Sequence, residues 1–271
     1  MSKTVIDASK SKLSLNLREL FEYRDLFLVL AWRDVRVRYA QTFLGLLWAF
    51  IQPLATLLIF TLIFGRAIKV ETGDIPYPVY ALAGMVTWSY FAYVLSQSGQ
   101  SIIGAQEMVK KIYFPRLVIP VSKAMTGFVD FFITLIFLGG LMVYYKVPLS
   151  LNVYLLPLFF LLGVLAALGM GIWMSSLTIR YRDFQHVIPF LVQIGLYATP
   201  IAYPVSMIPD KYQMMYHLNP MAGVVEGFRW SILGGQNISE FAWVSFVVII
   251  VLFISGLFYF RKVERIMADI V

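Results

Sequence analysis

Polar and aromatic side chains recur every three or four residues inside apolar stretches of this sequence, so each series would follow one face of a helix. Such a stripe has two chemical uses inside a membrane. It can join helices by hydrogen bonds, or it can line a polar conduit. The series are Gln41, Gly45, Trp48, Gln52 and Thr56; Ser89, Tyr93, Gln97 and Ser101; Ser122, Thr126, Asp130 and Thr134; and the pair Gln193 and Tyr197.

The aromatic members bear on which ligand a conduit would carry. Aromatic faces beside amides and hydroxyls suit a ligand with C–H patches and hydroxyl groups, which is the surface of a sugar. Aromatic residues also gather at membrane interfaces as anchors, and that alternative stays open. The residues that we predict to line a conduit are Trp48, Gln52, Tyr93, Gln97, Gln193 and Tyr197.

Asp130 interrupts the apolar stretch Ala124–Tyr145, and it is the only Asp, Glu, Lys or Arg in the apolar stretches. A charge at mid-membrane costs at least about 2.5 kcal/mol, so Asp130 is expected to face the protein interior or water. A stand-alone proton-coupled carrier could use such a carboxylate. No second intramembrane carboxylate or Lys accompanies it, and the sequence leaves the role of Asp130 open.

The composition identifies the solvent in which these stretches must fold. Of 271 residues, 60% are hydrophobic and 14% are charged, whereas soluble domains carry about 25% charged residues. A water-soluble globule of this length could not bury so much apolar surface. Cysteine is absent, which excludes disulfide frameworks, thiolate metal sites and Cys nucleophiles. The chain is therefore expected to fold mostly in lipid.

Six apolar stretches reach the length of about 20 residues that a bilayer-spanning helix needs. They predict an all-α polytopic membrane protein, organised as one transmembrane domain over residues 1–271. A further uncharged stretch, Tyr212–Val225, is too short to span and contains Asn219-Pro220, so we expect re-entrant or surface helices there. The predicted spans are about 43–64, 79–103, 122–145, 153–178, 187–205 and 241–260, with an external segment at 205–240.

Basic residues set the expected orientation. The N-terminal segment, the loops after the second and fourth spans, and the C-terminal segment hold 17 of the 22 Lys and Arg residues. The positive-inside rule therefore places both termini in the cytoplasm. The net charge of +7 follows from this surplus. Because the charge is spread over four juxtamembrane segments, we expect no nucleic-acid partner.

Two segments outside the spans have helical periodicity. Over 13–38, apolar residues repeat every three or four positions, which predicts an amphipathic helix in the interface plane with Asn16 as its N-cap. The loop 104–123 is also helix-compatible. For both, simple anchoring or connection and the docking of a partner remain alternatives. In the external segment, Glu226 and Arg229 would share a helix face, so an ion pair is expected, with substrate contact as the alternative.

Catalytic and nucleotide-binding motifs are absent from the sequence. There is no G-x-x-x-x-G-K-[ST] phosphate loop, no G-x-S-x-G and no H-E-x-x-H. His186 and His217 fall on opposite sides of the membrane in this topology and cannot share a metal. Gly169-Met170-Gly171 lies inside a span and favours close packing over cofactor binding. We expect no catalytic residue, cofactor or metal on this chain, so active transport would draw on an ion gradient or another subunit.

Two groups of motifs carry a resemblance to a known family. The first is Trp32–Tyr39 (WRDVRVRY), then Thr42–Trp48 (TFLGLLW) and Gln52-Pro53-Leu54. The second is Thr199–Pro204 (TPIAYP), then Pro209, Asn219-Pro220, Arg229 and Leu233-Gly234. With the six spans, they resemble the membrane permeases of ATP-binding-cassette exporters of O-antigen, capsule and teichoic acid, over nearly the whole chain.

The resemblance implies a permease that does not itself hydrolyse ATP. It implies a homodimer in the membrane lipid of the bacterial inner (plasma) membrane, bound to two copies of a cytoplasmic nucleotide-binding ATPase subunit that holds ATP and Mg. The implied substrate is a lipid-linked polysaccharide, with O-antigen first. Capsular polysaccharide or teichoic acid is the alternative, and a drug or lipid exporter is a further one.

The resemblance also gives roles to segments that periodicity left open. Residues 106–115 match a coupling helix that contacts the ATPase, with helix 13–38 beside it, and 198–235 resembles external gate helices. The implied coupling residues are Gln106, Glu107, Lys110, Lys111, Tyr113 and Arg116. The implied interface-helix residues are Arg18, Glu22 and Arg33, and the implied gate residues are Pro200, Pro204, Asn219, Pro220 and Arg229.

Overall fold

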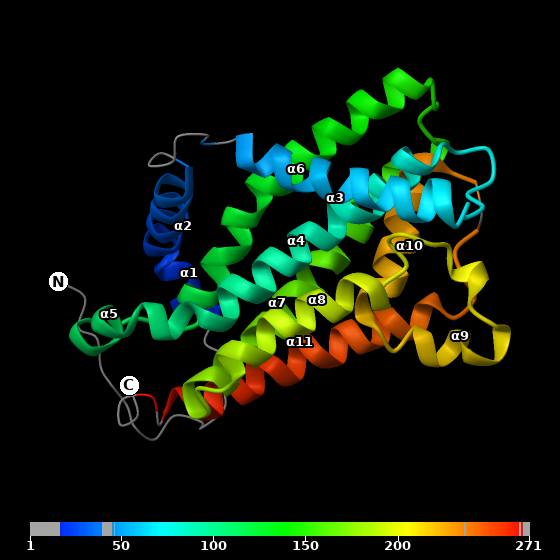
Figure 1. Cartoon of the computed structure of the whole chain (residues 1–271). Helices are drawn as coiled ribbons and strands as arrows, with labels where there is room; N and C mark the ends of the chain where they lie inside the picture. The colour runs from blue at the N-terminus through cyan, green and yellow to red at the C-terminus, as the bar shows by residue number, and fades with distance from the viewer. Residues whose placement is uncertain (1–16, 40–44, 46, 236, 266, 268–271) are drawn as a thin grey trace.

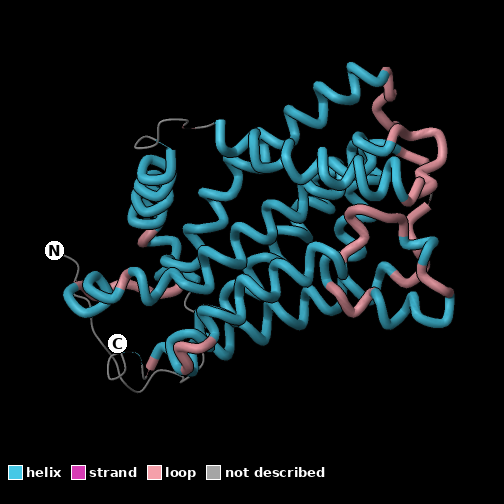
Figure 2. The backbone as a smooth tube through the Cα atoms, in the orientation of Figure 1, coloured by secondary structure: helices cyan, strands magenta, loops and turns pink. Residues whose placement is uncertain are grey.

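The structure is a computed structural model that describes residues 17–39, 45, 47–235, 237–265 and 267. Long helices dominate, and no strand occurs in the described part of the chain (Figure 2). Helix α5 (Gln106–Lys111) lies at one end of the bundle, and helix α9 (Asp210–Tyr216) lies at the other (Figure 1). We call these the α5 end and the α9 end.

Five helical segments are long and apolar enough to cross a membrane, and they confirm five of the predicted spans within a few residues. Helices α3 and α6 run from the α5 end toward the α9 end, and α4, α7 and α11 run in the opposite direction (Figure 1). They are α3 (Leu47–Phe60) with its π-helical continuation η1 (Thr61–Ala67), α4 (Tyr77–Gly104), α6 (Val118–Tyr145), α7 (Leu156–Arg180) with the preceding turn η2 (Leu151–Leu155), and α11 (Ala242–Glu264).

The remaining predicted span, 187–205, is shorter in the structure. Helix α8 (Phe184–Ala198) has 15 residues and ends at Ala198. At 1.5 Å per residue it is about 22 Å long, less than the roughly 30 Å hydrocarbon core. Thr199 precedes Pro200, and a residue before proline is disfavoured in helical geometry, so the helix stops there.

Helix α4 is the centre of the bundle, with α6, α7, α8 and α10 (Pro220–Leu233) packed around it. Its residues from Val79 to Val86 are almost entirely buried. Aromatic rings fill the space between α4, α6 and α7. The Phe131 and Phe160 rings stack with centroids 3.8 Å apart, and Tyr90 meets both edge-on. Such packing fixes these three helices relative to one another.

Glycines let α7 and α11 meet backbone to backbone. A Cβ atom on Gly169 would lie 2.9 Å from the Phe253 backbone, and one on Gly256 would lie 2.9 Å from the Gly169 carbonyl oxygen. Small residues permit this approach between helices in lipid. The prediction that the Gly169 motif serves packing is therefore confirmed.

The segment before the first span differs from the single amphipathic helix predicted over 13–38. It forms α1 (Leu17–Glu22) and α2 (Arg24–Tyr39), and Asn16 lies outside the described residues. Leu30 is buried, but Leu28 and Trp32 are exposed beside it, so the apolar side chains do not keep to one face. Spacing alone missed this because α2 packs on α6 and leaves apolar side chains on its outer surface as well.

The α9 end is built from short helices and turns. After α8 come the turn 199–204, the single turn η3 (Val205–Met207), α9 and α10. Asn219 caps α10 by accepting a hydrogen bond from the Met221 amide, and α10 ends where Gly234 takes a φ of 67°. The turn 199–204 falls within the predicted span 187–205, and η3, α9 and α10 occupy the segment 205–240.

Candidate functional site

A cavity of about 350 Å³ lies between α3, α4, α6 and α8, and we call it the bundle cavity. It is open to the outside, because Gln52 and Gln193 on its wall are exposed. Along α4 it extends from Met85 to Ser96, a rise of about 16 Å. Four helices and one side chain from α2 line it. The lining residues are Arg38, Ala49, Gln52, Pro53, Thr56, Met85, Trp88, Ser89, Ala92, Tyr93, Ser96, Asp130, Thr134, Val192, Gln193 and Leu196.

Half of the predicted conduit residues lie on this cavity. Gln52, Tyr93 and Gln193 line it, each from a different helix. The other predicted positions are exposed elsewhere, with Trp48 at 54% and Tyr197 at 57%, and Gln97 is exposed as well. A step of four residues turns a helix by about 400°, so a strict series drifts off its face by about 40° per step. Ser96 and Leu196 therefore replace Gln97 and Tyr197.

Sequence reasoning missed Trp88 and Arg38. Trp88 is 5% exposed and lines the cavity, but it lies about 100° around the helix from Ser89. A stripe of polar residues drawn through Ser89 therefore did not include it. Arg38 enters the cavity from α2, far away in sequence from the α6 residues it meets. No local pattern predicts such a tertiary contact.

Arg38 and its neighbours join α2 to α6. The Arg38 guanidinium lies 2.5 Å from one Asp130 carboxylate oxygen, and the Tyr39 hydroxyl donates a hydrogen bond of 2.5 Å to the other. One turn earlier on α2, Asp34 pairs with Lys123 of α6. The Arg38 guanidinium also lies 4.3 Å from the centroid of the Tyr93 ring. We call this group of contacts the α2–α6 latch.

The latch shows what the Asp130 carboxylate contacts. The residue is 8% exposed and lines the bundle cavity, so the prediction that it faces the protein interior is confirmed. Both carboxylate oxygens are bonded, which is the arrangement of a structural ion pair. A carrier that shuttles protons would first have to break these bonds, so the geometry does not favour the proton-relay alternative.

The predicted coupling residues lie on or beside α5. Glu107 and Lys111 form an exposed ion pair of 3.2 Å, and Ile112 and Tyr113 directly after α5 are 61% and 74% exposed. Gln106 belongs to the first turn of α5 and Lys110 is exposed. Arg116 differs, because its guanidinium donates a hydrogen bond of 2.8 Å to the Glu264 carbonyl oxygen of α11.

An apolar cluster holds α2 and α5 to the bundle. Leu30 of α2 and Val109 of α5 are both buried in it, together with Phe260 of α11. Of the predicted interface-helix residues, Arg33 pairs with Asp34 at 3.0 Å and Glu22 is exposed. Arg18 belongs to α1, and its side chain lies outside the described residues. A displacement of α2 or α5 would therefore reach the ends of the long helices.

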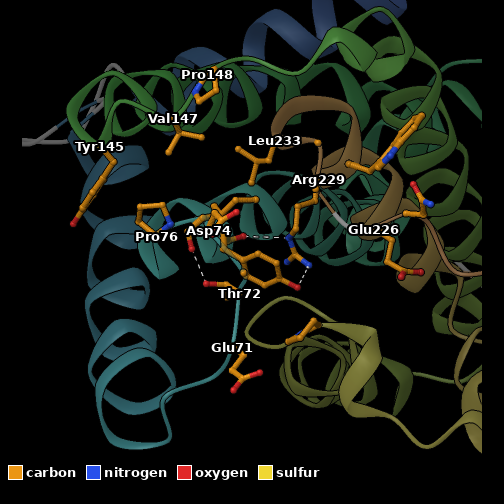
Figure 3. Close-up of a pocket in the computed structure, with 18 of the residues that line it drawn as sticks. Glu71, Thr72, Asp74, Pro76, Tyr145, Val147, Pro148, Glu226, Arg229 and Leu233 are labelled. Atoms are coloured by element: carbon orange, nitrogen blue, oxygen red, sulfur yellow. Dashed lines mark hydrogen bonds between the residues drawn. The ribbon is translucent and has the colours of Figure 1, made fainter.

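At the α9 end, Arg229 holds the turn 199–204. Its guanidinium is buried and donates four hydrogen bonds. Dashed lines in Figure 3 mark the two that go to Tyr80. The Nη2 atom binds the carbonyl oxygens of Pro200 and Ile201 at 2.9 and 3.0 Å. Nε and Nη1 bind the carbonyl and hydroxyl oxygens of Tyr80 at 3.2 and 2.7 Å. One side chain thus ties α10 to α4 and to the turn.

Asn219 holds the same turn from its other side. Its Nδ2 atom donates hydrogen bonds to the Ala198 carbonyl oxygen at 3.2 Å and to the Thr199 hydroxyl at 2.9 Å. Pro220 occupies the first turn of α10, where it needs no amide partner. Pro204 precedes η3 at the end of the turn. The five predicted gate residues therefore meet around one turn.

The expected ion pair between Glu226 and Arg229 does not occur in the described structure. Glu226 instead faces Nε2 of His217 at 2.8 Å, and Arg229 turns toward α4. The His217 Nδ1 atom donates to the Gln213 carbonyl oxygen at 2.8 Å. Burial lowers the pKa of His217, but the hydrogen bonds to Glu226 and Gln213 outweigh burial and raise it above its ordinary value. Spacing missed this because both side chains found partners on other elements.

A metal would need several His, Asp or Glu side chains close together. Across the described ranges, no three such side chains gather in this way. The bundle cavity, the turn held by Arg229 and the α5 surface are the features from which we argue a function.

A family model described as ABC-2 type transporter matches residues 25–233. The chain belongs to this family. The match covers α2 through α10, including the latch, α5 and the turn held by Arg229. The resemblance that the motifs suggested is thereby confirmed.

Individual relatives match most of the chain. It is 31% identical to the O-antigen export system permease protein RfbA of Klebsiella pneumoniae, over 96% of this chain and 98% of the relative. It is 27% identical to the protein of the same description from Myxococcus xanthus, over 79% and 82%. It is also 27% identical to the polysialic acid transport protein KpsM of Escherichia coli, over 87% and 92%.

The latch makes a first prediction. Replacing Arg38 by Met or Asp130 by Asn leaves a charge without its partner, so each should lower stability by about 1–3 kcal/mol. The double variant should cost less than the sum, with a coupling energy of at least about 1 kcal/mol in chemical unfolding. The exposed pair Glu107–Lys111 is the matched control, with a coupling energy of about 0.5 kcal/mol or less. Equal coupling in both pairs would contradict the latch.

The His217–Glu226 contact predicts a pH dependence. Since the pKa of His217 is raised in the folded protein, the contact stabilises fully below about pH 6.5, and this stability is lost as pH rises through the folded pKa. The thermal unfolding temperature should fall between about pH 6 and pH 9. Glu226→Gln should flatten this part of the profile. His186→Gln, at an exposed histidine, should leave it unchanged.

Proposed function

We propose that this chain is the membrane permease subunit of an ATP-driven polysaccharide exporter. The observation that carries the proposal is the bundle cavity, an open hollow between apolar helices whose wall includes Trp88, Tyr93, Gln52 and Gln193. Aromatic faces and amides suit the C–H patches and hydroxyls of a sugar chain. The relatives described as O-antigen export and polysialic acid transport proteins support the same substrate class.

The proposed substrate is a lipid-linked polysaccharide, and O-antigen is the first choice because the Klebsiella relative is the more similar of the two described kinds. Capsular polysaccharide is the alternative that the KpsM relative supports. The chain would sit in the bacterial inner membrane as a homodimer. Six spans, with α8 and the turn after it as the fifth, would place both termini in the cytoplasm, as the basic residues indicate.

The energy would come from two copies of a cytoplasmic ATPase that bind ATP and Mg. The exposed Ile112 and the ion-paired surface of α5 suit the docking of such a subunit, because exposed apolar side chains beside charges are typical of interfaces. The apolar cluster that holds Leu30 and Val109 would carry the ATPase movement to α2. The latch would then carry it to Asp130 on the wall of the bundle cavity.

The turn 199–204 is the proposed gate. Leu196 lines the bundle cavity just before the turn, and Arg229 and Asn219 hold the turn from α10. Opening a path at the α9 end would require these hydrogen bonds to break. Because hydrogen bonds to charged groups contribute about 1.5–3 kcal/mol each, the gate would stay closed without an input of energy.

The conduit predicts that a glutamine that lines the bundle cavity matters for export, whereas a glutamine elsewhere on the bundle does not. Gln193→Leu removes a cavity amide and should reduce ATP-driven glycan export about fivefold, since one lost hydrogen bond is worth about 1 kcal/mol. Gln97→Leu makes the same change at an exposed residue off the cavity and should leave export within about twofold. Export is measured as glycan at the cell surface. Equal losses in both variants would remove the conduit assignment.

The α5 surface makes a prediction about the partner. Ile112→Ser, combined with Ala at Glu107, Lys110 and Lys111, should weaken co-purification of the ATPase about tenfold and reduce export in parallel. Leu151→Ser is the control, because Leu151 is 93% exposed at the opposite end. Unchanged export and unchanged co-purification of the ATPase would show that this surface does not couple. Transport by the purified chain alone in vesicles would contradict the proposed function itself.

A further inference from the structure

A second and larger cavity, of about 640 Å³, opens at the α9 end, and we call it the outer cavity. Its volume lies in the range of small-molecule binding sites. Residues from five separate segments line it. Figure 3 labels lining side chains from several of them, among them Glu71, Tyr145 and Glu226. The segments are the loop 71–76, Tyr80 of α4, residues 145–148, residues 204–205, and α10 with Gly234, Gly235, Asn237 and Ile238 after it.

The outer cavity lies beyond the proposed gate. Leu196 lines the bundle cavity and Pro204 lines the outer cavity, so the turn between them forms the partition. Tyr80 and Arg229 line the outer cavity, and both belong to the hydrogen-bond network that holds that turn. A chain that passes the open gate therefore enters a preformed cavity whose wall includes the gate's own clamp.

The lining of the outer cavity matches the surface of a sugar. Tyr80, Tyr145 and Trp230 contribute aromatic rings. The carboxylates of Glu71 and Glu226 are acceptors for hydroxyl groups, and ionised carboxylates have no hydrogen to donate. His217 fixes one Glu226 oxygen, so its carboxylate has a defined direction. Rigid aromatic and acceptor groups around a concave site are what binding a polyhydroxylated ligand requires.

The charges in the two cavities argue against a polyanionic chain. Among the described residues that line them, the two arginines bond to acceptors, and the outer cavity holds three carboxylates (Glu71, Asp74 and Glu226) against two basic side chains (Lys146 and Arg229). Arg38 pairs with Asp130, and Arg229 donates to four oxygens. Lys146 shares the outer cavity with the exposed carboxylates of Glu71 and Asp74. A glycan with an acid on each repeat would meet like charges without a compensating basic surface.

We propose that the outer cavity is a saccharide-binding site that receives the exported chain beyond the gate, and that it takes uncharged sugar residues. The inference rests on the proposed export function and narrows its substrate class. It favours a neutral glycan over a polymer of acidic sugars, although relatives of both descriptions match the chain.

The test places a photo-crosslinking residue, benzoylphenylalanine, at Tyr145 in the full-length chain. Cells that carry this chain as their only permease, with its ATPase and their own lipid-linked glycan, are irradiated during export. Permease–glycan adducts are then measured by gel shift and glycan staining. The matched control is the same substitution at Tyr154, which is 72% exposed at the same end but does not line the cavity. Glu71, in a loop, provides a second position if the Tyr145 variant accumulates poorly.

The expected result is an adduct at Tyr145 at least about tenfold above that at Tyr154, and its glycan should contain no acidic sugar. Normal export with no adduct above the Tyr154 level at either lining position would overturn the binding site and leave the proposed function standing. An adduct whose glycan carries an acid on each repeat would overturn the charge argument. Cells that export no glycan even with the unsubstituted chain would overturn the proposed function, and the inference with it.

Discussion

The guanidinium of Arg229 is a positive charge in the interior, and the α9 end is arranged around it. Removing an ion from water costs several kcal/mol, so a buried Arg must recover that energy from bonds. It does so from four oxygens on two other segments, and its guanidinium carbon also lies 3.7 Å from the centroid of the Tyr80 ring. Because the bonds are to α4 and to the turn after α8, the charge fixes three elements at once.

Asp130 imposes the same constraint at the other side of the bundle cavity. A carboxylate in the middle of α6 needs partners, and α2 supplies Arg38 and Tyr39. The bundle cavity lies between these two polar networks, one fixed to α2 and the other to α10. A transporter that couples two distant surfaces through an apolar bundle needs directional polar contacts of this kind. Apolar contacts alone are non-directional and do not specify one arrangement of the helices.

Most of the fold follows from the sequence because the bilayer dictates helix length and polarity. Five spans, the packing role of Gly169 and the interior position of Asp130 could all be derived from composition and spacing. The side of each helix that lines a cavity was less predictable, since a four-residue step drifts around a 3.6-residue helix. Pairings across the chain, such as His217 with Glu226 in place of Arg229 with Glu226, depend on which elements become neighbours and leave no local signal.

The glycine contact between α7 and α11 bears on which helices could move relative to one another. Two helices whose backbones touch have no side-chain layer that could repack, so they shift only as one body. Helix α8 is the opposite case, because Ile188 is its one buried residue among the fifteen described. In a transport cycle that widens the bundle and closes it again, α7 and α11 would keep their positions relative to each other. Helix α8 would move against them, and the turn 199–204 that Arg229 holds would be its moving end.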